Sequence, residues 1–409
     1  MCKLYAEGQY AADNPQKMRI IVRILLYLRT DDEDMYIYQT DNWPHFYWDK
    51  DAINAKLAAV NKAEGFLSGR LSALGFDARM NAVVETFSHD ILASSEIEGV
   101  ILNSDQVRSS VARRMGVNIT GGVEPSHYID GVVEMMIDAT KNYASPLTDD
   151  RLFGWHNCLF PTGRSGMDEI DVAQYRVGPM KVVSGTLERE KVHYRAPEAD
   201  AVPHEMQIFL EWFNSDSTPK DYIKSAVAHF WFVSIHPFDD GNGRISRAIA
   251  DMALSQADDS SLRFFSISRQ INKEKTKYND ILERCQKGTC DISRWVEWYL
   301  DCMSRAIENA DEMLSSILDK SIFWQTHAQA TVTNRQKDIL NLYLDGYRGK
   351  LNVKNWAKKA AVSVDTASRD VKVLVDKGIL VPQPGRVRDV SYGISISGDR
   401  VIVPGPQDE

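Results

Sequence analysis

The stretch "SIHPFDDGNGRISRAI", which begins at Ser234, most strongly constrains the fold of this chain. The preceding "DYIKSAVAHFWFVS" is apolar over one broad face, which predicts a buried helix. That helix should end at His236, because a proline disfavours helical geometry in the residue before it. Gly241 and Gly243 allow a sharp turn and a close approach of the backbone to a ligand, and "GRISRAIADMAL" then restarts a helix.

This loop has the features of an anion site. Its N–H groups converge on a helix N-terminus, where the backbone donors and the macrodipole both attract negative charge. Arg244 and Arg247 are three residues apart and share one helix face. Asp240 is placed to hold Mg²⁺ through one carboxylate, with a nucleotide supplying further oxygens. A lone histidine, a glycine turn or an Asp–Arg cluster is usually structural, but their joint occurrence favours phosphate binding.

The bulk composition is that of a globular protein with two to four domains. The chain has 409 residues, of which 44% are hydrophobic and 26% are charged. The net charge of -9 excludes a protein whose whole surface binds nucleic acid, although it allows one basic domain. The five cysteines form no metal-binding motif and indicate reduced thiols in a cytoplasmic protein.

Residues 1–34 are an uncertain N-terminal extension. Cations interrupt the apolar run "KMRIIVRILLYLRT", which is also too short to span a bilayer, so we predict no membrane partner. Two interpretations stay open: a basic helix on a membrane surface, or a gene start placed upstream of Met35.

The rest of the chain divides into four parts. We expect a small N-terminal domain at 35–80, a mostly helical body at 81–320, a separate domain at 331–396 and a tail at 397–409. The body is interrupted by "MKVVSGTLEREKVHYRAP", whose alternating pattern predicts a β-hairpin. A long amphipathic helix at 290–320 is a candidate homodimer seam.

Residues 331–396 carry a charge of +6, which leaves -15 for the remainder. Three helix-like stretches, the third capped by Ser363 or Asp365, precede a basic hairpin, an order typical of a winged helix. The third helix would present to DNA the side chains of Thr366, Ser368, Arg369 and Lys372. Winged helices also serve as docking or dimerisation modules, and both interpretations stay open.

The sequence "HPFDDGNGRISR" resembles the signature of the Fic (filamentation induced by cAMP) family, HxFx(D/E)GNGRxxR, and matches every specified position. The resemblance covers about residues 81–300, and the segment 35–80 resembles a small domain that precedes Fic in some members. It implies a mostly α fold: a Fic-type helical bundle with a β-hairpin flap, a small N-terminal domain and a C-terminal winged-helix (α+β) domain.

The resemblance implies a protein adenylyltransferase, which transfers AMP from ATP to a Ser, Thr or Tyr hydroxyl of a target protein or of itself and releases pyrophosphate. It implies a general base at His236, which suits the near-neutral pKa of histidine. It also implies Mg²⁺ at Asp240, an α-phosphate anion hole at Gly241, Asn242 and Gly243, a β-phosphate ligand at Arg244 and a γ-phosphate ligand at Arg247.

Two looser matches accompany the signature. The hairpin at about 180–195 falls where the family has a flap that receives the target backbone as an added strand. The stretch "SRQINKEKTKYNDIL" resembles a second motif in which a tyrosine pair lies near the nucleotide. Here Asn279 replaces one tyrosine, and the match implies only Tyr278 near the adenine.

The stretch "SSEIEGV" fits the family's inhibitory motif, (S/T)xxxE(G/N), as Ser94, Glu98 and Gly99. Its position implies an inhibitory helix near 88–99 in the N-terminal part of the chain. Ser94 and Glu98 share a helix face because they are four residues apart, whereas Glu96 lies on another. The resemblance implies that Glu98 pairs with Arg247 and keeps ATP in an unproductive pose. Some members also remove AMP, and the sequence leaves that reverse activity open.

Two alternatives remain. A Fic transferase can use another donor, such as one that delivers UMP, phosphocholine or phosphate, although the intact loop and both arginines favour a nucleoside triphosphate. The chain could instead be a winged-helix transcriptional regulator with the Fic body as a sensor, against which the intact signature argues. The target, the modified residue type and the oligomeric state are left open.

Overall fold

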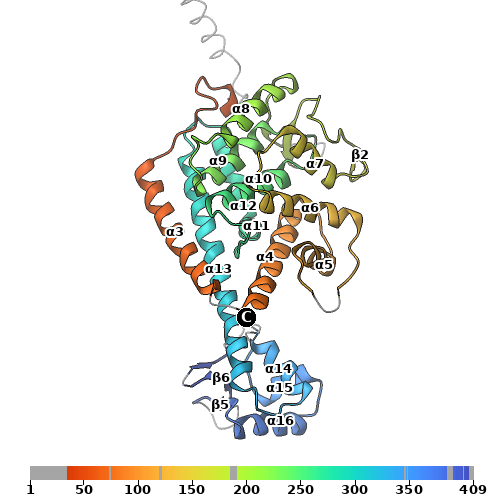
Figure 1. Ribbon diagram of the computed structural model, residues 1–409, viewed down its shortest axis with the longest axis vertical. Helices are drawn as coiled ribbons and strands as arrows, with labels where there is room; N and C mark the ends of the chain where they lie inside the picture. The colour runs from red at the N-terminus through yellow and green to blue at the C-terminus, as the bar shows by residue number, and fades with distance from the viewer. Residues whose placement is uncertain are drawn as a thin grey trace, which may run out of the picture.

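The computed structural model describes residues 35–72, 75–118, 122–184, 191–344, 347, 349–384, 390–398 and 400–404. The predicted extension at 1–34 lies outside these residues, as does the predicted hairpin tip at Gly185. Figure 1 shows a large helical body and a smaller unit, joined by the long helix α13 (Ser293–Thr326). The protein is mostly helical, as predicted.

The body is a helical bundle with small sheet elements. Its helices are α3 (Lys50–Ser72), α4 (Phe76–Ile97), α5 (Ser104–Met115), α6 (His127–Lys141), α7 (Asp149–Leu159), α8 (Val202–Asn214), α9 (Tyr222–Ile235), α10 (Asn242–Ala257), α11 (Ile267–Lys273), α12 (Lys275–Gln286) and α13. Short 3₁₀ turns lie at Ile37–Gln39 and Ala199–Ala201. Two antiparallel pairs complete it: β1 (Arg164–Ser165) with β2 (Asp168–Glu169), and β3 (Lys181–Ser184) with β4 (Lys191–Arg195).

The helix α9 lies at the centre of the body. All of its residues are buried, because its sequence is apolar or small on nearly every face. Its N-terminus is capped by Asp221, whose side chain accepts the Lys224 N–H at 3.0 Å. The helix α10 packs against α9 and is almost as deeply buried, so the loop between the two helices is anchored on both sides.

The segment predicted as a separate domain at 35–80 packs into the same hydrophobic core as the rest of the body. Ile37, Ile53, Val60 and Leu67 belong to one buried cluster that extends to Leu314. The helix α3 lies along α13 (Figure 1). The predicted boundary at residue 80 falls inside α4, because the apolar face of that helix continues into the common core.

The C-terminal unit has its own core. It contains α14 (Asn334–Leu344), α15 (Val353–Ala360), α16 (Val364–Asp376) and an antiparallel sheet in the order β5 (Leu380–Pro382), β6 (Tyr392–Ser397), β7 (Arg400–Ile402). Ser363 caps α16 by accepting the Thr366 N–H. This is the element order expected of a winged helix.

Two boundaries of this unit differ from the prediction. Phe323 of α13 is fully buried in the second core, so the long helix continues past residue 320 into the unit. The strand β7 lies within the predicted tail at 397–409, because Ile402 pairs with Ile394 of β6 and completes the sheet.

None of the helices in the described part of the chain combines the length and apolar character needed to cross a bilayer.

Candidate active site

His236 ends α9 in a left-handed conformation, with φ 52° and ψ 59°. Its Nδ1 lies 3.1 Å from the Val233 carbonyl oxygen. A carbonyl can only accept, so Nδ1 carries the proton and Nε2 keeps its lone pair. Burial lowers the pKa of His236, although the bond to Val233 opposes the shift. The imidazole is therefore neutral near pH 7, as a general base requires.

The turn at Gly241 requires glycine for two reasons. Its φ is +84°, a conformation that side chains disfavour, and a Cβ there would lie 2.9 Å from Phe160. The next residue, Asn242, begins α10 and is buried, with 2% of its surface exposed. Its side chain accepts the Phe238 N–H at 3.0 Å and donates to the Phe238 carbonyl at 2.8 Å.

The side chain of Asn242 therefore closes the loop, and both ends of its amide already have partners. The contribution of Asn242 to an anion hole stays a prediction, and these two bonds argue against a contact through its side-chain amide. The remaining donors at this point are backbone N–H groups, because the first residues of a helix lack intrahelical acceptors. No side chain caps the N-terminus of α10.

Two residues that sequence reasoning missed hold the loop from outside. Arg176 donates from Nε to the His236 carbonyl and from Nη1 to the Gly178 carbonyl, both at 2.8 Å. The buried His156 accepts the Ala173 N–H at Nδ1 and donates from Nε2 to the Asp240 carbonyl at 3.1 Å. Its ring stacks on Phe238 with centroids 4.3 Å apart.

Asp240 presents a partly exposed carboxylate, with 41% of its side chain accessible. It accepts hydrogen bonds from the Gly241 N–H and the Ser165 hydroxyl, and it lies 3.7 Å from Arg244 Nη2. No group of three or more His, Cys, Asp or Glu residues suited to a metal lies among the described residues. One partly exposed carboxylate beside a helix N-terminus would fit Mg²⁺ that takes its other ligands from a nucleotide and water.

Arg244 is buried on α10 at 3% exposure. Its Nη1 donates to the Tyr128 hydroxyl at 3.2 Å, and its guanidinium lies 5.0 Å from the centre of the Phe160 ring. Its Nε has no hydrogen-bond partner. A buried cation that leaves a donor unused suits an anionic ligand at the end of the helix.

Arg247 is held by the end of α4. Its Nε donates to Ser94 Oγ, and its Nη2 donates to the Ser94 carbonyl and to Glu98 Oε1, each at 2.8 Å. The ion pair joins a guanidinium with 2% exposure to a carboxylate with 35% exposure. The structure thus brings together Ser94, Glu98 and Arg247, whereas Glu96 instead accepts from Asn272.

The Glu98 carboxylate also covers the N-terminus of α10. A Cβ built on Gly243 would clash with Glu98 Oε1, so only glycine lets the carboxylate approach the backbone this closely. A negative group thus lies beside the first turn of α10, where a helix N-terminus favours an anion.

The contact between Glu98 and Gly243 is one of three residue pairs that join α4 and α10. The helices meet in register at Glu98 with Gly243, at Ser94 with Arg247, and at Asp90 with Asp251. The partners follow the i, i+4 spacing on both helices. Burial raises the pKa of Asp251 well above its usual range, even though Arg263 lies 2.6 Å away.

Tyr278 lies on α12 and interacts with Arg247 of α10. Its hydroxyl is 3.0 Å from His229 Nε2, and its ring packs against Trp295 and Trp298 with only 4% of the residue exposed. Burial raises its pKa to about 12. The adenine contact stays a prediction, and this buried ring argues against it.

The predicted hairpin is present as β3 and β4, with a register irregularity between Val182 and Val183. Every residue of β3 is exposed, and within the described residues β3 pairs with no strand other than β4. Tyr194 of β4 is buried and donates to the carbonyl of Ser234 at 2.7 Å, two residues before His236. This bond ties the hairpin to the last turn of α9, next to the loop that begins at His236.

Two buried histidines predict loss of stability in acid. Burial lowers the pKa of His156 to about 4 and that of His229 to about 3, so both are neutral when folded. An unfolded histidine binds a proton near pH 6.5, so stability falls as pH drops below 6.5. We expect each to cost about 2 kcal/mol between pH 7 and pH 5.

Urea denaturation at both pH values measures this loss. His156→Gln is expected to lose less stability than the wild type, whereas His204→Gln, at an exposed position on α8, is expected to lose as much. An equal loss in all three proteins would rule out His156 as a source.

Comparisons with known proteins agree with the site geometry. A model of the "Fic/DOC family" matches residues 146–254, and one of a "Domain of unknown function (DUF4172)" matches residues 36–117. The protein adenylyltransferase Fic of Drosophila willistoni is 26% identical over 266 residues, which are 63% of this chain and 46% of that protein. Its counterpart in Drosophila virilis is 34% identical over 239 residues, 56% and 44% of the two chains.

A uridine 5'-monophosphate transferase of Xanthomonas campestris pv. campestris (strain 8004) is 32% identical over 120 residues, 27% of this chain and 22% of that protein. This chain therefore spans less than half the length of these three relatives.

Among solved structures, a Fic family protein from Desulfovibrio desulfuricans G20 has a TM-score of 0.49 at 19% identity, covering 87% of this chain and 99% of that one. The uninterrupted HPFDDGNGRISR loop between two buried helices and the matching family model show that this chain is a member of the Fic family.

Proposed function

We propose that this protein is an autoinhibited protein adenylyltransferase that transfers AMP from ATP to a Ser, Thr or Tyr hydroxyl of a target protein or of itself. The observation that carries the proposal is the Glu98 carboxylate. It lies over Gly243 and on Arg247, where the N-terminus of α10 offers a site for an anionic ligand.

Phosphate binding would use the donors that the loop leaves available. The N–H groups at the start of α10 would bind the α-phosphate, and Arg244 would bind the β-phosphate through its buried guanidinium. Arg247 would bind the γ-phosphate once Glu98 has moved away. In this proposal the donors would lie where negative charge develops in the transition state, so they would stabilise it without reorganisation.

In the transfer step, Nε2 of His236 accepts the proton of the target hydroxyl while that oxygen forms a bond to the α-phosphorus. The bond from the α-phosphorus to the oxygen that bridges to the β-phosphate breaks, and pyrophosphate leaves. Mg²⁺ on Asp240 would supply neutralising charge on the phosphates. The Val233 carbonyl keeps the proton on Nδ1 and so holds the ring in the reactive tautomer.

The target would approach along β3. An extended segment could add to the exposed edge of this strand through backbone hydrogen bonds, and the Tyr194 bond would hold that edge in a fixed relation to His236. Such a contact would recognise an extended backbone in the target and would not depend on the target's sequence.

The donor is tested by incubating the purified protein with labelled ATP, UTP and CDP-choline in parallel, with Mg²⁺. We expect label from ATP to exceed label from the other donors at least tenfold. Preferred use of UTP or CDP-choline would contradict the adenylyl assignment while keeping the transferase. Release of AMP from modified protein in the same assay tests the reverse reaction, for which Glu98 would orient water.

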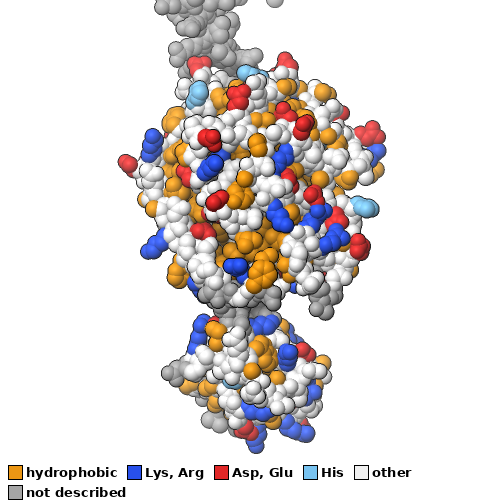
Figure 2. Space-filling view, in the orientation of Figure 1, with side chains coloured by type: hydrophobic (Ala, Val, Ile, Leu, Met, Phe, Trp, Pro, Cys, Tyr) orange, Lys and Arg blue, Asp and Glu red, His pale blue; other side chains and the backbone are white. Residues whose placement is uncertain are grey.

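A second role belongs to the C-terminal unit, and we propose that it binds DNA as a winged helix. Ser368, Arg369 and Lys372 are exposed on one face of α16, and Figure 2 shows Lys and Arg side chains along the lower edge of this unit. Gel shifts at two salt concentrations test this. Arg369→Gln is expected to weaken binding and to reduce its salt dependence, and equal shifts with and without the substitution would favour protein docking.

A further inference from the structure

A small hollow lies beside α4 in the helical body. It measures 30 Å³, room for about two or three water molecules, and is lined by Thr86, His89, Phe264, Phe265, Ser266, Arg269, Gln270, Lys273, Ala306, Asn309 and Ala310. Three helices meet there, since the lining comes from α4, α11 and α13 as well as from the loop before α11.

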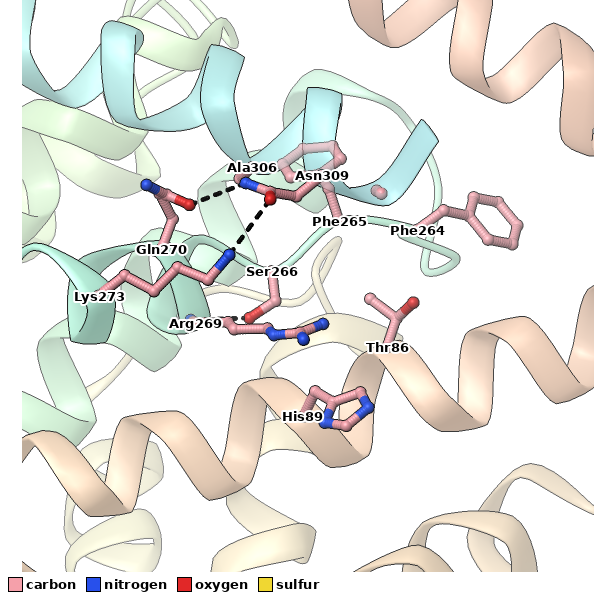
Figure 3. A pocket seen from close by; sticks show the side chains of 11 residues that line it. Thr86, His89, Phe264, Phe265, Ser266, Arg269, Gln270, Lys273, Ala306 and Asn309 are labelled. Atoms are coloured by element: carbon pink, nitrogen blue, oxygen red, sulfur yellow. Dashed lines mark hydrogen bonds between the residues drawn. The ribbon is translucent and has the colours of Figure 1, made fainter. Parts of the chain in front are cut away.

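The walls carry positive charge without a matching negative charge. Arg269, Lys273 and His89 contribute cationic or proton-accepting groups, and no Asp or Glu lies among the lining residues. Figure 3 shows the Arg269 guanidinium reaching into the hollow between His89 on α4 and Lys273 on α11. The proximity of Arg269 contributes to lowering the pKa of His89, after burial.

The nearby carboxylates have other partners. Glu85 accepts from Arg108, Asp90 accepts from Ser266 and Ser268, and Glu274 accepts from Arg305. Lys273 donates to the neutral Asn309 at 3.2 Å. Within the described residues, the side chains of Arg269 and His89 make no hydrogen bond and no ion pair.

We propose that this hollow binds one free tetrahedral oxyanion, with inorganic phosphate as the representative ligand, between His89 of α4 and Arg269 and Lys273 of α11. The guanidinium fork matches two oxygens of such an ion, and the ammonium and imidazolium groups match others. The small volume selects a single phosphate-sized ion over a nucleotide.

The bound anion would tie the inhibitory helix to the body. His89 lies on α4, five residues before Ser94 and nine before Glu98. An anion that joins His89 to Arg269 would therefore stabilise the docked position of α4. This link to inhibition rests on the proposed function, whereas binding of the anion does not.

The test uses the full chain and labelled sulfate, which keeps its charge across the pH range, in equilibrium dialysis at constant ionic strength. We expect Arg269→Gln to weaken sulfate binding at least tenfold, because a charged donor pair is lost. Two controls should leave the site intact: Arg284→Gln, at an exposed position in the last turn of α12, and Arg244→Gln, which disables the catalytic loop. Loss with Arg244→Gln and not with Arg269→Gln would overturn the proposal.

The pH dependence gives a second readout. His89 is the only histidine among the side chains that line the hollow, and burial, followed by the nearby Arg269, lowers its pKa while Glu85 opposes the shift. Sulfate should bind more tightly at pH 5.5 than at pH 7.5, and His89→Gln should remove that difference. His89→Gln also replaces the first test if Arg269→Gln does not fold. Equal affinity at both pH values in the wild type would contradict the assignment.

Amide hydrogen exchange measures the effect on α4. Sulfate or phosphate should slow exchange over residues 84–97 in the wild type and leave it unchanged in Arg269→Gln, whatever the transferase activity of either protein. Unchanged exchange in a wild type that binds sulfate would separate the site from the inhibitory helix and overturn that part of the proposal.

Discussion

Replacing His236 with alanine is expected to lower AMP transfer by about 10²–10⁴-fold, the usual contribution of a positioned general base. The Val233 carbonyl fixes the proton on Nδ1, and burial keeps the ring neutral, so Nε2 is ready to accept the hydroxyl proton. The measurement is the rate of label transfer from ATP in a Glu98→Gly background, where a slow residual rate can be quantified.

His204→Ala provides the matched control, because this histidine is exposed on α8. Its rate should equal that of the parent. The rate of the parent should also fall as pH drops below 6.5 through the lowered pKa of His236, since a protonated ring cannot act as a base. A His236→Ala protein that transfers AMP within a factor of ten of its parent would contradict the mechanism.

The parts of the site that are contiguous in the chain could be predicted from the sequence. The two buried helices, the glycine turn and the spacing of the arginines are local patterns, and the hairpin follows from its alternation. The pairing of Glu98 with Arg247 was implied by a family motif, since no local rule joins residues so far apart in the sequence.

Contacts from side chains that are distant in the sequence and bond to the backbone of the loop could not be predicted in this way. His156 and Arg176 act on carbonyls of Asp240 and His236, and a backbone carbonyl leaves no signature in the sequence of its partner. For the same reason, the use of the Asn242 amide by the backbone of its own loop could not be predicted.

Replacing Glu98 with glycine is expected to raise auto-AMPylation by about tenfold to a hundredfold. ATP must displace the carboxylate from Arg247 before its γ-phosphate can bind, and a charge-assisted hydrogen bond of this kind contributes about 1.5–3 kcal/mol. The partial exposure of Glu98 reduces that value, because solvent screens the pair. The rate of label incorporation from ATP measures the change.

Glu96→Gly is the matched control, since Glu96 is two residues away and its side chain contacts Asn272 rather than Arg247. Its rate should stay near that of the wild type, although glycine inside the last turn of α4 costs about 1 kcal/mol of helix stability. Equal incorporation in the wild type and Glu98→Gly would show that the carboxylate does not restrain the enzyme.

A substitution of Arg247 tests whether this residue only holds Glu98 or also binds ATP. If Arg247 is both the residue that Glu98 holds and the ligand of the γ-phosphate, then Arg247→Gln should lower the rate again in the Glu98→Gly background. If Arg247 served only to bind Glu98, the double variant would transfer AMP at the same raised rate as the Glu98→Gly protein. The double variant therefore decides whether inhibition works by occupying a catalytic arginine or by covering the N-terminus of α10 at Gly243.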